Sequence, residues 1–592
     1  MTRQLFAAAL ALAAGLALLP GAGGAREPET TLDADAPEPD AEPEPGPEVA
    51  TPELPRFHVD SAPVAATGRT LEVPAGGDLQ DALDRALPGD TVAVAAGATF
   101  RGPFLLRDKP DSGWIVVRTG APDGSLPPPG TRVDPSFAGV MPKLVSGSDA
   151  VLGAAPGAHH YRFIGVEIRP EEGRFLFNLV RFGDTATSHA DLPHHLVFDR
   201  CYIHGDPTLG ARRGIALNAR YAAVVDSYLS DFKEAGADSQ AIAVWNGPGP
   251  FAIEGNYLEG AGENLIFGGG DPALRGLVPS DIEIRRNRFT KPLSWRVGDP
   301  AYAGTPWTIK NLLELKNARR VLIDGNLFDH NWPGAQNGYA ILFTVRNQGG
   351  RAPWSVVRDV TFVNNVVRSV ASGINILGRD DNHRSRVTRR ILIRNNLFDD
   401  VGGAWGDGRL FQLLDGTRSV VIEHNTALQT GSILLGGEGA PHLGFVLRDN
   451  IAPHNDYGII GSGTGMGTPS LVRYFPGAEV RGNVIAGGDA ALYPSGNFFP
   501  RSLDAIGFTD RAAGDYRLAA SSPYRGAATD GRDPGADFGA ISVARAPAPG
   551  ARVGAPRGSS GAVKGPDRPL GGAADHRVDD RAAAIEQRRV HE

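Results

Sequence analysis

One short segment concentrates residue types that can bind charged groups and move protons. Residues 307–317 read WTIKNLLELKN, and the alternating leucines of this segment fit the inward side of a β-strand. Glu314 and Lys316 would then share the outward side, about 7 Å apart along the strand. The chain has only seven lysines beside 52 arginines, and Lys310 lies in the same segment. A carboxylate and two ammonium groups on one face can take part in acid–base chemistry.

Related side chains recur at matching places later in the sequence. AILFTVRN places Arg346 at the end of an equivalent strand, and GINILGRDDNH continues the pattern. Five of the seven tryptophans fall in the same part of the chain. Indole faces beside charged and amide groups suit a sugar chain, whose ring faces are apolar and whose edges are polar. We expect a substrate-binding groove formed by Lys310, Asn311, Glu314, Trp332, Arg379 and Asp380. The alternative is that the tryptophans only pack against the fold and the charges are solvated.

Cleavage of a uronate by β-elimination is one reaction that such a groove can support. It needs a neutralised carboxylate, a base for the C5 proton and a proton donor for the leaving oxygen. Lys316 is the candidate base if burial and nearby cations lower its pKa, although Glu314 acts in the opposite direction. Arg346, Asn311 or a bound Ca²⁺ are the candidates for stabilising the developing negative charge. Calcium is the only cofactor that we consider, and its ligands are not identified.

The proton donor and the hydrolytic alternative rest on other residues. His330 is the candidate donor, with Tyr339 as the alternative. An inverting hydrolase would instead need paired carboxylates. Asp380 and Asp381 are available, but adjacent residues of a strand face opposite ways.

A repeat of about ten copies explains how these side chains would be positioned. Its clearest copies include FAIEGNYL, RVLIDGNLF and RILIRNNLF, in which an apolar residue stands three positions before a shared slot. Most copies have another apolar residue two positions earlier, an alternation typical of a strand with one buried face. A unit of two or three short strands buries that face only when many units stack. The slot is occupied by Cys201, Ser227, Asn256, Asn287, Asn326, Asn365, Asn396, Asn425, Asn450 and Asn483.

The slot residues have a structural interpretation. Asparagine tolerates left-handed backbone at a corner between strands, and its amide can bond the same amide in neighbouring coils. Cys201 shares the slot, so we interpret it as a packed corner residue and not as a nucleophile. His194, His195 and His204 lie nearby, but no acidic partner stands at a clear ligand spacing, which disfavours a metal site.

The repeat predicts an all-β fold: a single-stranded right-handed parallel β-helix solenoid of about ten or more coils, with an N-terminal capping helix. Residues 76–106 contain a short amphipathic helix and then the strand 91–94, and this stretch resembles the N-terminal cap of secreted pectate-lyase-like β-helix proteins. The resemblance covers residues 70–540. Residues 516–541 resemble the closing segment of such proteins, and the acidic turns in them are a further candidate calcium site.

The stretch NLLELKNARRVLIDGNLF and the later AILFTVRN resemble the catalytic region of the chondroitinase B and alginate lyase class of β-helices. In that class a strand ending in Lys-Ser or a similar pair precedes an Asn-x-Phe corner, and an Arg follows on the next coil. The resemblance implies that Lys316 corresponds to the catalytic base and Arg346 to its partner. The class has an acidic calcium ligand near the position of Asn311, where this chain has an amide, and the loop before Arg346 is longer here.

Charge and cysteine content exclude other classes of function. The net charge is −8, and residues 26–53 alone carry ten acidic residues and one Arg. The remaining chain is close to neutral, so no basic field attracts nucleic acid. Cys201 is the only cysteine, which excludes a disulfide framework and a cysteine zinc site.

The two ends of the chain differ in composition from its centre. Residues 1–25 combine Arg3, an apolar run and a small-residue ending, which predicts a signal peptide, and no other segment is apolar enough to span a membrane. We expect an acidic, proline-rich disordered linker at 26–55, then the N-terminal cap and first coil at 56–110. The β-helix would follow at 111–500, a closing segment at 501–545 and a disordered tail at 546–592.

These observations together favour a secreted monomer, periplasmic or extracellular, that acts on an acidic polysaccharide. A lyase is favoured over a glycoside hydrolase or an epimerase, because Lys310, Glu314, Lys316 and Arg346 cluster. The alternative is a non-catalytic β-helix that binds glycan or serves as a surface adhesin. The acidic spacer and the incomplete ligand set favour that alternative.

Overall fold

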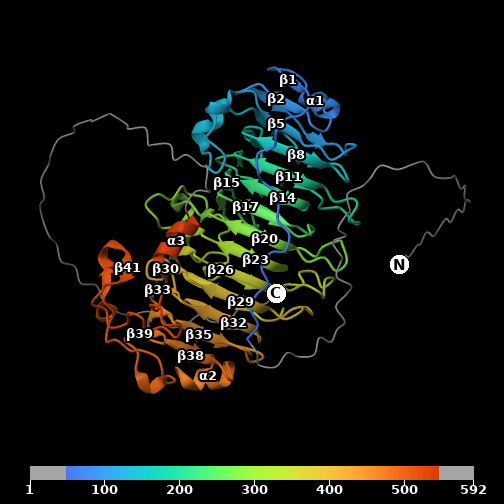
Figure 1. The fold of residues 1–592 in the computed structure, drawn as a ribbon. Helices are drawn as coiled ribbons and strands as arrows, with labels where there is room; N and C mark the ends of the chain where they lie inside the picture. Colours follow the sequence, from blue (N-terminus) through green and yellow to red (C-terminus); the bar gives the residue numbers. More distant parts are fainter. Residues whose placement is uncertain (1–48, 546–592) are drawn as a thin grey trace, which may run out of the picture. The chain divides into compact units, whose positions relative to one another are not determined.

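The computed structural model describes residues 49–545. The expected signal peptide, the expected tail and most of the expected linker therefore lie outside the described residues. In the described part, three long sheets of parallel strands form a coiled stack (Figure 1). No helix in residues 49–545 has the length and apolar character needed to cross a membrane.

The first sheet, which we name sheet A, has 14 strands, each paired in parallel with the strand of the next coil. Its strands are β1 (Thr70–Val73), β2 (Thr91–Val94), β5 (Ile115–Thr119), β8 (His159–Ile164), β11 (His194–Asp199), β14 (Arg220–Val225), β17 (Phe251–Glu254), β20 (Ser280–Arg285), β23 (Ala318–Asp324), β26 (Val357–Val363), β29 (Arg389–Arg394), β32 (Arg418–Glu423), β35 (Val446–Arg448) and β38 (Glu479–Arg481).

Sheet B has 13 strands and follows sheet A in each coil. Its strands are β3 (Thr99–Arg101), β6 (Lys143–Ser146), β9 (Glu167–Pro170), β12 (Tyr202–His204), β15 (Tyr228–Phe232), β18 (Tyr257–Gly260), β21 (Arg288–Thr290), β24 (Leu327–Asn331), β27 (Val366–Val370), β30 (Leu397–Val401), β33 (Thr426–Gln429), β36 (Ile451–Pro453) and β39 (Val484–Ala486).

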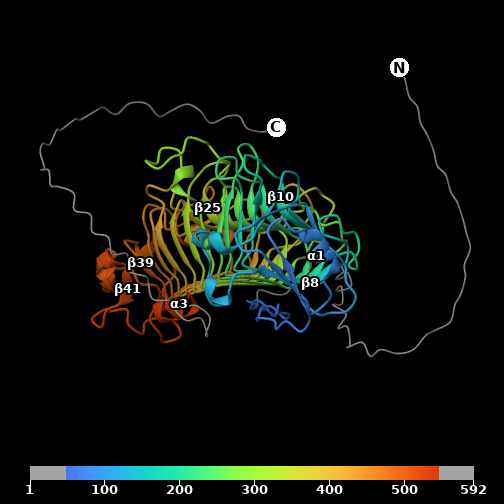
Figure 2. The same ribbon diagram turned by 90° about the horizontal axis from the view of Figure 1, so that it is seen from above.

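Sheet C has 12 strands and closes each coil. Its strands β10 and β25 lie on the opposite side of the stack from β8 of sheet A (Figure 2). The strands are β4 (Phe104–Leu106), β7 (Leu152–Ala154), β10 (Asn178–Phe182), β13 (Arg213–Leu217), β16 (Gln240–Val244), β19 (Glu263–Phe267), β22 (Asn311–Leu315), β25 (Tyr339–Thr344), β28 (Ser372–Leu377), β31 (Phe411–Leu414), β34 (Leu434–Gly437) and β37 (Ile459–Gly461).

The chain repeats the order A, B, C from coil to coil, which makes the fold a right-handed parallel β-helix, as the repeat predicted. The apolar residues that precede each slot form the part of the core that sheet A contributes. Ile284, Ile323 and Phe362 lie in register on three successive strands of sheet A and are fully buried. Stacking like on like in this way fills the interior without gaps.

The slot residues form a continuous ladder of side-chain hydrogen bonds. The amide oxygen of Asn365 accepts from both the backbone N–H and the side-chain amide of Asn326, at 2.9 and 3.0 Å. The same pattern joins the neighbouring asparagines, and Cys201 takes part through its backbone N–H, which donates to the hydroxyl of Ser227. The left-handed backbone falls on the residue before the slot, for example Arg286 and Asn364, and not on the slot asparagine as we expected.

Short elements cover the two ends of the stack. Helix α1 (Leu79–Arg85) lies at the end formed by β1 and buries Leu79, Ala82 and Leu83 (Figure 1). At the other end is α2 (Thr468–Tyr474) (Figure 1). The antiparallel pair β40 (Phe508–Asp510) and β41 (Asp515–Leu518) lies along the side of the stack, where the Tyr516 hydroxyl donates to Asp399 of β30 at 2.7 Å. Helix α3 (Phe538–Arg545) is the last described element.

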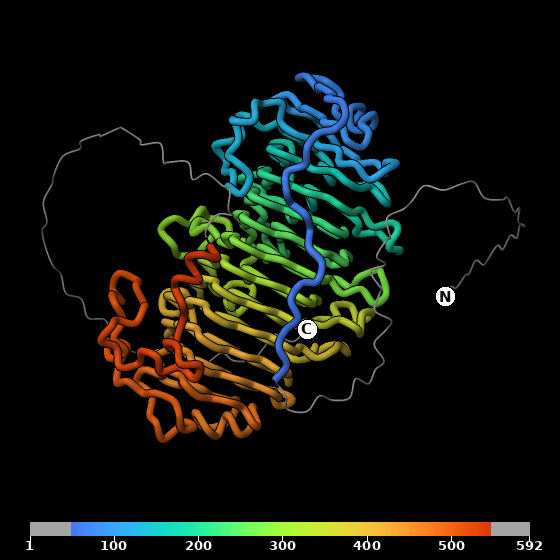
Figure 3. Tube along the Cα trace, in the orientation of Figure 1, coloured from blue at the N-terminus to red at the C-terminus, as the bar shows by residue number. Residues whose placement is uncertain are grey.

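Residues 49–62 form an extended segment along the outer face of sheet A, which we call the N-terminal strap (Figure 3). The backbone N–H groups of Ala50, Glu53 and Arg56 donate to side chains two coils apart, those of Ser419, Asp359 and Asp281. Three residues of extended polyproline chain rise about 9.3 Å, and two coils rise about 9.6 Å, so the spacings match. The chain therefore already follows the solenoid at residues 49–55, which we had assigned to the disordered linker.

Candidate functional site

The outward face of β22 carries a connected row of polar side chains. Glu314 is 2% exposed, and its two oxygens are shared among three neighbours. Its Oε2 accepts from the amide of Asn311 at 3.2 Å, and its Oε1 accepts from the hydroxyl of Thr344 at 3.4 Å. The Lys316 ammonium lies 3.6 Å from the same Oε1. Leu313 and Leu315 are fully buried on the other side, so Glu314 and Lys316 share one face. We call Lys310, Asn311, Glu314 and Lys316 the β22 strip.

A second buried carboxylate lies one coil away from the strip. Glu263 pairs in register with Asn311 and is fully buried. Its Oε2 accepts from Gln240 at 2.8 Å, and its Oε1 lies 3.5 Å from the Lys310 ammonium. Burial, followed by the charges of Glu314 and Asp238, raises the pKa of Glu263 to about 7. This carboxyl group can therefore hold a proton near neutral pH.

Lys310 is held by acidic groups on both sides. Its ammonium forms ion pairs with Asp238 and Glu263. Burial lowers the pKa of Lys310, but these carboxylates outweigh burial and raise it. Lys310 is therefore a fixed positive charge and not a base.

Arg346 adjoins the far end of the strip. Its backbone N–H donates to the carbonyl of Lys316 at 2.9 Å, so the two residues lie on neighbouring coils. The guanidinium binds both Asp380, at 2.9 Å, and Asp381. Both aspartates face Arg346 because they lie in the loop after β28, where the alternation expected for a strand does not apply. Arg379, which we expected in the groove, is exposed in the same loop.

Four tryptophans surround a cavity of about 490 Å³, which we call the tryptophan cavity. Its aromatic walls are Trp295, Trp307, Trp332 and Trp405. The Arg296 guanidinium lies 4.4 Å from the ring centre of Trp405, and the Lys233 ammonium lies 5.5 Å from those of Trp295 and Trp307. These cation–π contacts hold the rings in place.

The tryptophan cavity adjoins the strip at the beginning of β22. Ile309 lines the cavity two residues before Asn311, and its carbonyl accepts from the backbone N–H of Ala335 at 2.8 Å. The amide of Asn311 donates to Gln336 at 3.3 Å, and Gln336 follows the cavity-lining residues 332–335. An apolar hollow and a charged row therefore lie end to end.

Two of the five clustered tryptophans lie outside this cavity. The Arg213 guanidinium lies over the ring of Trp245, 5.5 Å from its centre. The Trp354 indole N–H donates to the carbonyl of Leu277. Trp405 completes the cavity from a loop about 70 residues beyond Trp332. The sequence carries no signal for that partnership, because only the stacking of coils brings the two loops together.

The expected proton donors lie near the Asn311 end of the strip, and the candidate base Lys316 lies at the other end. His330 is on β24 of sheet B, and its ring stacks on Trp405 with centres 5.4 Å apart. Lys316 stands at the opposite end of β22, about 16 Å along the strand. Tyr339 begins β25 beside Asn311 and donates its hydroxyl to Gln412. The structure therefore does not bring His330 or Tyr339 together with Lys316, and the role of His330 as proton donor stays a prediction.

Charge at the strip also argues against a resident calcium ion there. Glu263, Asn311 and Glu314 offer the oxygen ligands that Ca²⁺ prefers. Two ammonium groups, however, lie at 3.5 and 3.6 Å from the two carboxylates. A dication would have to displace or share space with both lysines, so the residues at this position do not fit calcium. In the closing segment, Asp533 pairs with Arg525 and Asp537 caps α3, so these acids are also engaged.

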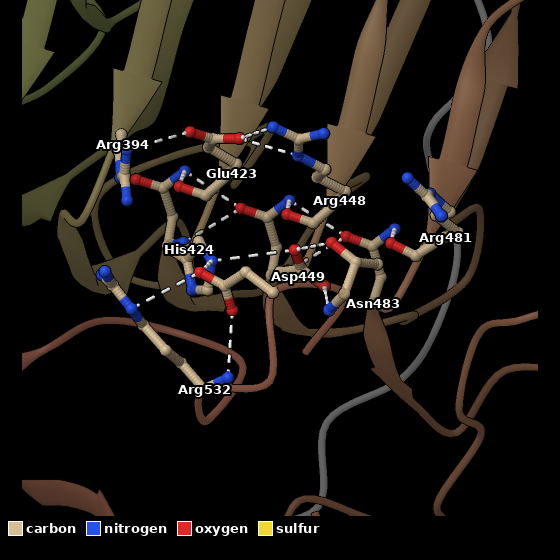
Figure 4. Close-up of polar contacts among 12 residues, drawn as sticks. Arg394, Glu423, His424, Arg448, Asp449, Arg481, Asn483 and Arg532 are labelled. Carbon is tan, nitrogen blue, oxygen red and sulfur yellow. Dashed lines mark hydrogen bonds and ion pairs between the residues drawn. The ribbon is translucent and has the colours of Figure 1, made fainter. Parts of the chain in front are cut away.

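A smaller polar cavity of about 330 Å³ lies where the closing segment meets the corner between sheets A and B (Figure 4). Glu423 accepts from Arg448 and lies 3.5 Å from Arg394, so the charges compensate one another. Thr529 donates its backbone N–H and its hydroxyl to Asp449. These contacts fasten the closing segment to the solenoid, and we assign the cavity a structural role.

No family model and no curated protein matches the chain. Among solved structures, a mannuronic acid specific family 6 polysaccharide lyase from human gut microbiota is similar with a TM-score of 0.45 and 12% identity, over 74% of this chain and 93% of that one. The PL6 family alginate lyase AlyGC gives 0.38 and 15%, over 81% and 59%. Pectate lyase Pel9A gives 0.32 and 12%, over 78% and 92%. The chain thus spans under two thirds of the length of AlyGC, and the likeness concerns the fold alone.

Proposed function

We propose that the tryptophan cavity and the β22 strip bind a polysaccharide chain, and that the strip cleaves it at a uronate by β-elimination. One observation carries the proposal. A hollow walled by four tryptophans adjoins the beginning of the β22 strip, and at the other end of the strip Lys316 lies beside Glu314 and Arg346 follows on the next coil. Sugar rings would stack on the indoles while their charged edges meet the strip.

The roles of the strip residues follow from their contacts. The exposed Asp381 is the weaker of the two acids bound to Arg346, because Asp380 is buried and also accepts a backbone N–H from Asn347. A uronate carboxylate would replace Asp381 on the guanidinium, which neutralises its charge. That step makes the C5 proton more acidic.

Lys316 would then act as the base. Its ammonium group lies 3.6 Å from the buried carboxylate of Glu314, and its carbonyl accepts from the backbone N–H of Arg346 on the next coil. Lys316 in its neutral form takes the C5 proton. The C5–H electron pair forms the C4–C5 double bond, the C4–O bond breaks, and the new ammonium group returns its proton to the leaving oxygen.

The direct test is a screen of the purified mature protein against alginate, pectate, chondroitin and heparin-type chains. The unsaturated product absorbs in the ultraviolet, so each reaction can be followed continuously. Activity with and without chelator is compared, and we expect no chelator effect because the strip does not fit calcium. Absence of product from every chain would refute the lyase proposal.

A non-catalytic glycan-binding protein is the second candidate, and one observation favours it. Both cations of the strip already have an acidic partner, Asp238 for Lys310 and Glu314 for Lys316. Arg346 on the next coil likewise has Asp380. A groove without excess positive charge also suits a neutral glycan. Binding to a glycan without any product would support this candidate.

Export and a monomeric state remain part of the proposal. The composition of residues 1–25 motivates the first. N-terminal sequencing of protein recovered outside the cytoplasm should give a chain that starts at Arg26. Light scattering should give the mass of one chain.

A further inference from the structure

Four histidines lie together on sheet A, far along the chain from the strip. His159 and His160 begin β8, and His194 and His195 begin β11 on the next coil. His159 pairs in register with His194, so the four side chains form two rows of two. One nitrogen each from His160, His194 and His195 lies within 4.8 Å of the other two. This is the only such group of potential metal ligands in residues 49–545.

The backbone and the aromatic neighbours define where these rings lie. His160 and His195 have φ values of 57° and 53°, a left-handed conformation that recurs at the second residue of sheet A strands, for example at Tyr221. Their rings stack with centres 4.3 Å apart. Trp114 meets His160 edge-on at 5.2 Å, and Tyr221 stacks on His195 at 4.7 Å. Aromatic rings thus flank the stacked pair on both sides along the coil axis.

The fourth histidine connects the group to a carboxylate. His159 Nε2 lies 3.5 Å from Asp108, and His159 Nδ1 lies 2.8 Å from His160 Nδ1. If His159 donates from Nε2 to Asp108, its Nδ1 accepts and His160 must donate from Nδ1. The lone pair of His160 is then on Nε2 and is free to bind a metal. Carboxylate-to-histidine chains of this kind orient metal ligands in proteins.

The second pair of histidines is joined in the same way as the first. His194 Nδ1 lies 2.7 Å from His195 Nδ1, so one ring donates this hydrogen bond and the other accepts it. The accepting ring must release this contact before its lone pair can bind a metal.

We propose that His160, His194 and His195 bind one divalent transition-metal ion of the zinc class. Imidazole nitrogen is a preferred ligand of Zn²⁺, Co²⁺, Ni²⁺ and Cu²⁺. Tetrahedral ligation at about 2.0–2.1 Å requires nitrogens about 3.4 Å apart, so the parallel rings of His160 and His195 must unstack and turn toward a common point. The soft χ2 angle of histidine permits this movement. The fourth coordination position stays open to water or to an outside ligand.

The structure shows which histidines lie together, which the sequence did not. His204 was the third histidine considered, but its two nitrogens lie near Gly205 and Glu167 instead. His159 and His160 stand about 35 residues before His194 and His195, so only the coil register brings them together. The site is independent of the proposed glycan function, because it lies on another sheet.

Metal uptake by the full mature chain tests the proposal. We would titrate apo protein with Zn²⁺ by calorimetry and with Co²⁺ by visible absorption, and we expect one ion per chain. Replacing His160 and His195 with Gln should weaken binding more than about tenfold, and Asp108→Asn should weaken it about tenfold as a positioning change. Bound metal should raise the melting temperature, and the histidine variants should lose this increase.

Two controls keep the result interpretable. A chain with His576 and His591 both changed to Gln removes the two histidines beyond the described residues, and it should bind as the parent does. Apo melting curves of the His160 and His195 variants show whether they fold. Equal uptake by folded variants and parent, or no uptake at about 100 μM metal, would overturn the site.

Discussion

The ammonium group of Lys316 lies 3.6 Å from Glu314, and the two side chains are only 14% and 2% exposed. In the proposed lyase, Lys316 moves the proton and Glu314 holds the Lys316 side chain in position. Lys316→Ala and Glu314→Gln should each reduce turnover about 10²- to 10⁴-fold. The rate of product formation in the ultraviolet gives the measurement. Lys109→Ala, a lysine of the cap region, is the matched control and should leave the rate unchanged. A Lys316→Ala protein with normal turnover would place the site elsewhere.

Trp405 and Trp332 should contribute to glycan affinity whether or not the protein is an enzyme. Replacing either with Ala removes a wall of the tryptophan cavity, and we expect Kd to rise at least about tenfold. Trp354→Ala is the control, since that indole lies outside the cavity. Binding is measured by calorimetry with the best oligosaccharide from the screen. Equal losses for all three variants would indicate a general folding defect.

Glu263 should make the free energy of unfolding depend on pH. Its pKa is about 7 in the folded chain and near its ordinary value of 4.5 when unfolded. The folded state holds a proton that the unfolded chain releases, so this contribution is present below pH 4.5 and is lost as pH rises through 7. Relative to Glu263→Gln, the wild type should lose up to about 3 kcal/mol across that range. Urea unfolding at pH 5 and pH 8 gives the free energy of unfolding of both proteins. An equal change with pH in the wild type and in Glu263→Gln would contradict the assignment.

Asn326 should be costly to replace. Asn326→Ala leaves the carbonyl of Ile284 and the backbone N–H of Asn287 without their partners, at about 2–4 kcal/mol. Asn326→Ser should cost less, because Ser227 fills the same slot and still accepts a backbone N–H. Chemical denaturation of the two variants gives the comparison. The ladder would not be a source of stability if Ala and Ser were equally tolerated.

Arg162 should hold the N-terminal strap in place. Its buried guanidinium donates to the carbonyls of Ser61 and Ala62 and to Asp199. Arg162→Met should cost about 2–3 kcal/mol and expose residues 49–62 to limited proteolysis, since Asp199 keeps only Arg200. Arg85→Met removes an exposed ion pair and should cost under about 1 kcal/mol. Unchanged protease resistance in Arg162→Met would show that the strap binds without this contact.

Much of the fold could be read from local patterns. The apolar residue three positions before each slot predicted inward residues such as Ile323, which is fully buried. These signals are local because each coil repeats the same short alternation of apolar and polar residues. The position of the left-handed residue was missed, because Asn tolerates that backbone while the structure assigns it to the preceding residue.

The sites depended on longer-range relationships. Sequence spacing placed Glu314 beside Lys316, since both belong to one strand. Sequence spacing could not show that His330 lies far from Lys316. The two residues are only 14 positions apart, but His330 is on β24 and Lys316 follows β22. Glu263 was not a candidate site residue, and only the strand register shows that it lies beside Asn311.

The sequence by itself therefore determined the repeating strand, the buried stripe and the asparagine ladder, which arise from periodicities within one coil. The tertiary structure alone decided which loops meet in the tryptophan cavity, that the four histidines converge and that residues 49–62 bind sheet A. Loop lengths between slots vary from coil to coil, so sequence distance does not predict which side chains stack. Contacts across coils depend on the register of the sheets, and that register is a property of the folded chain.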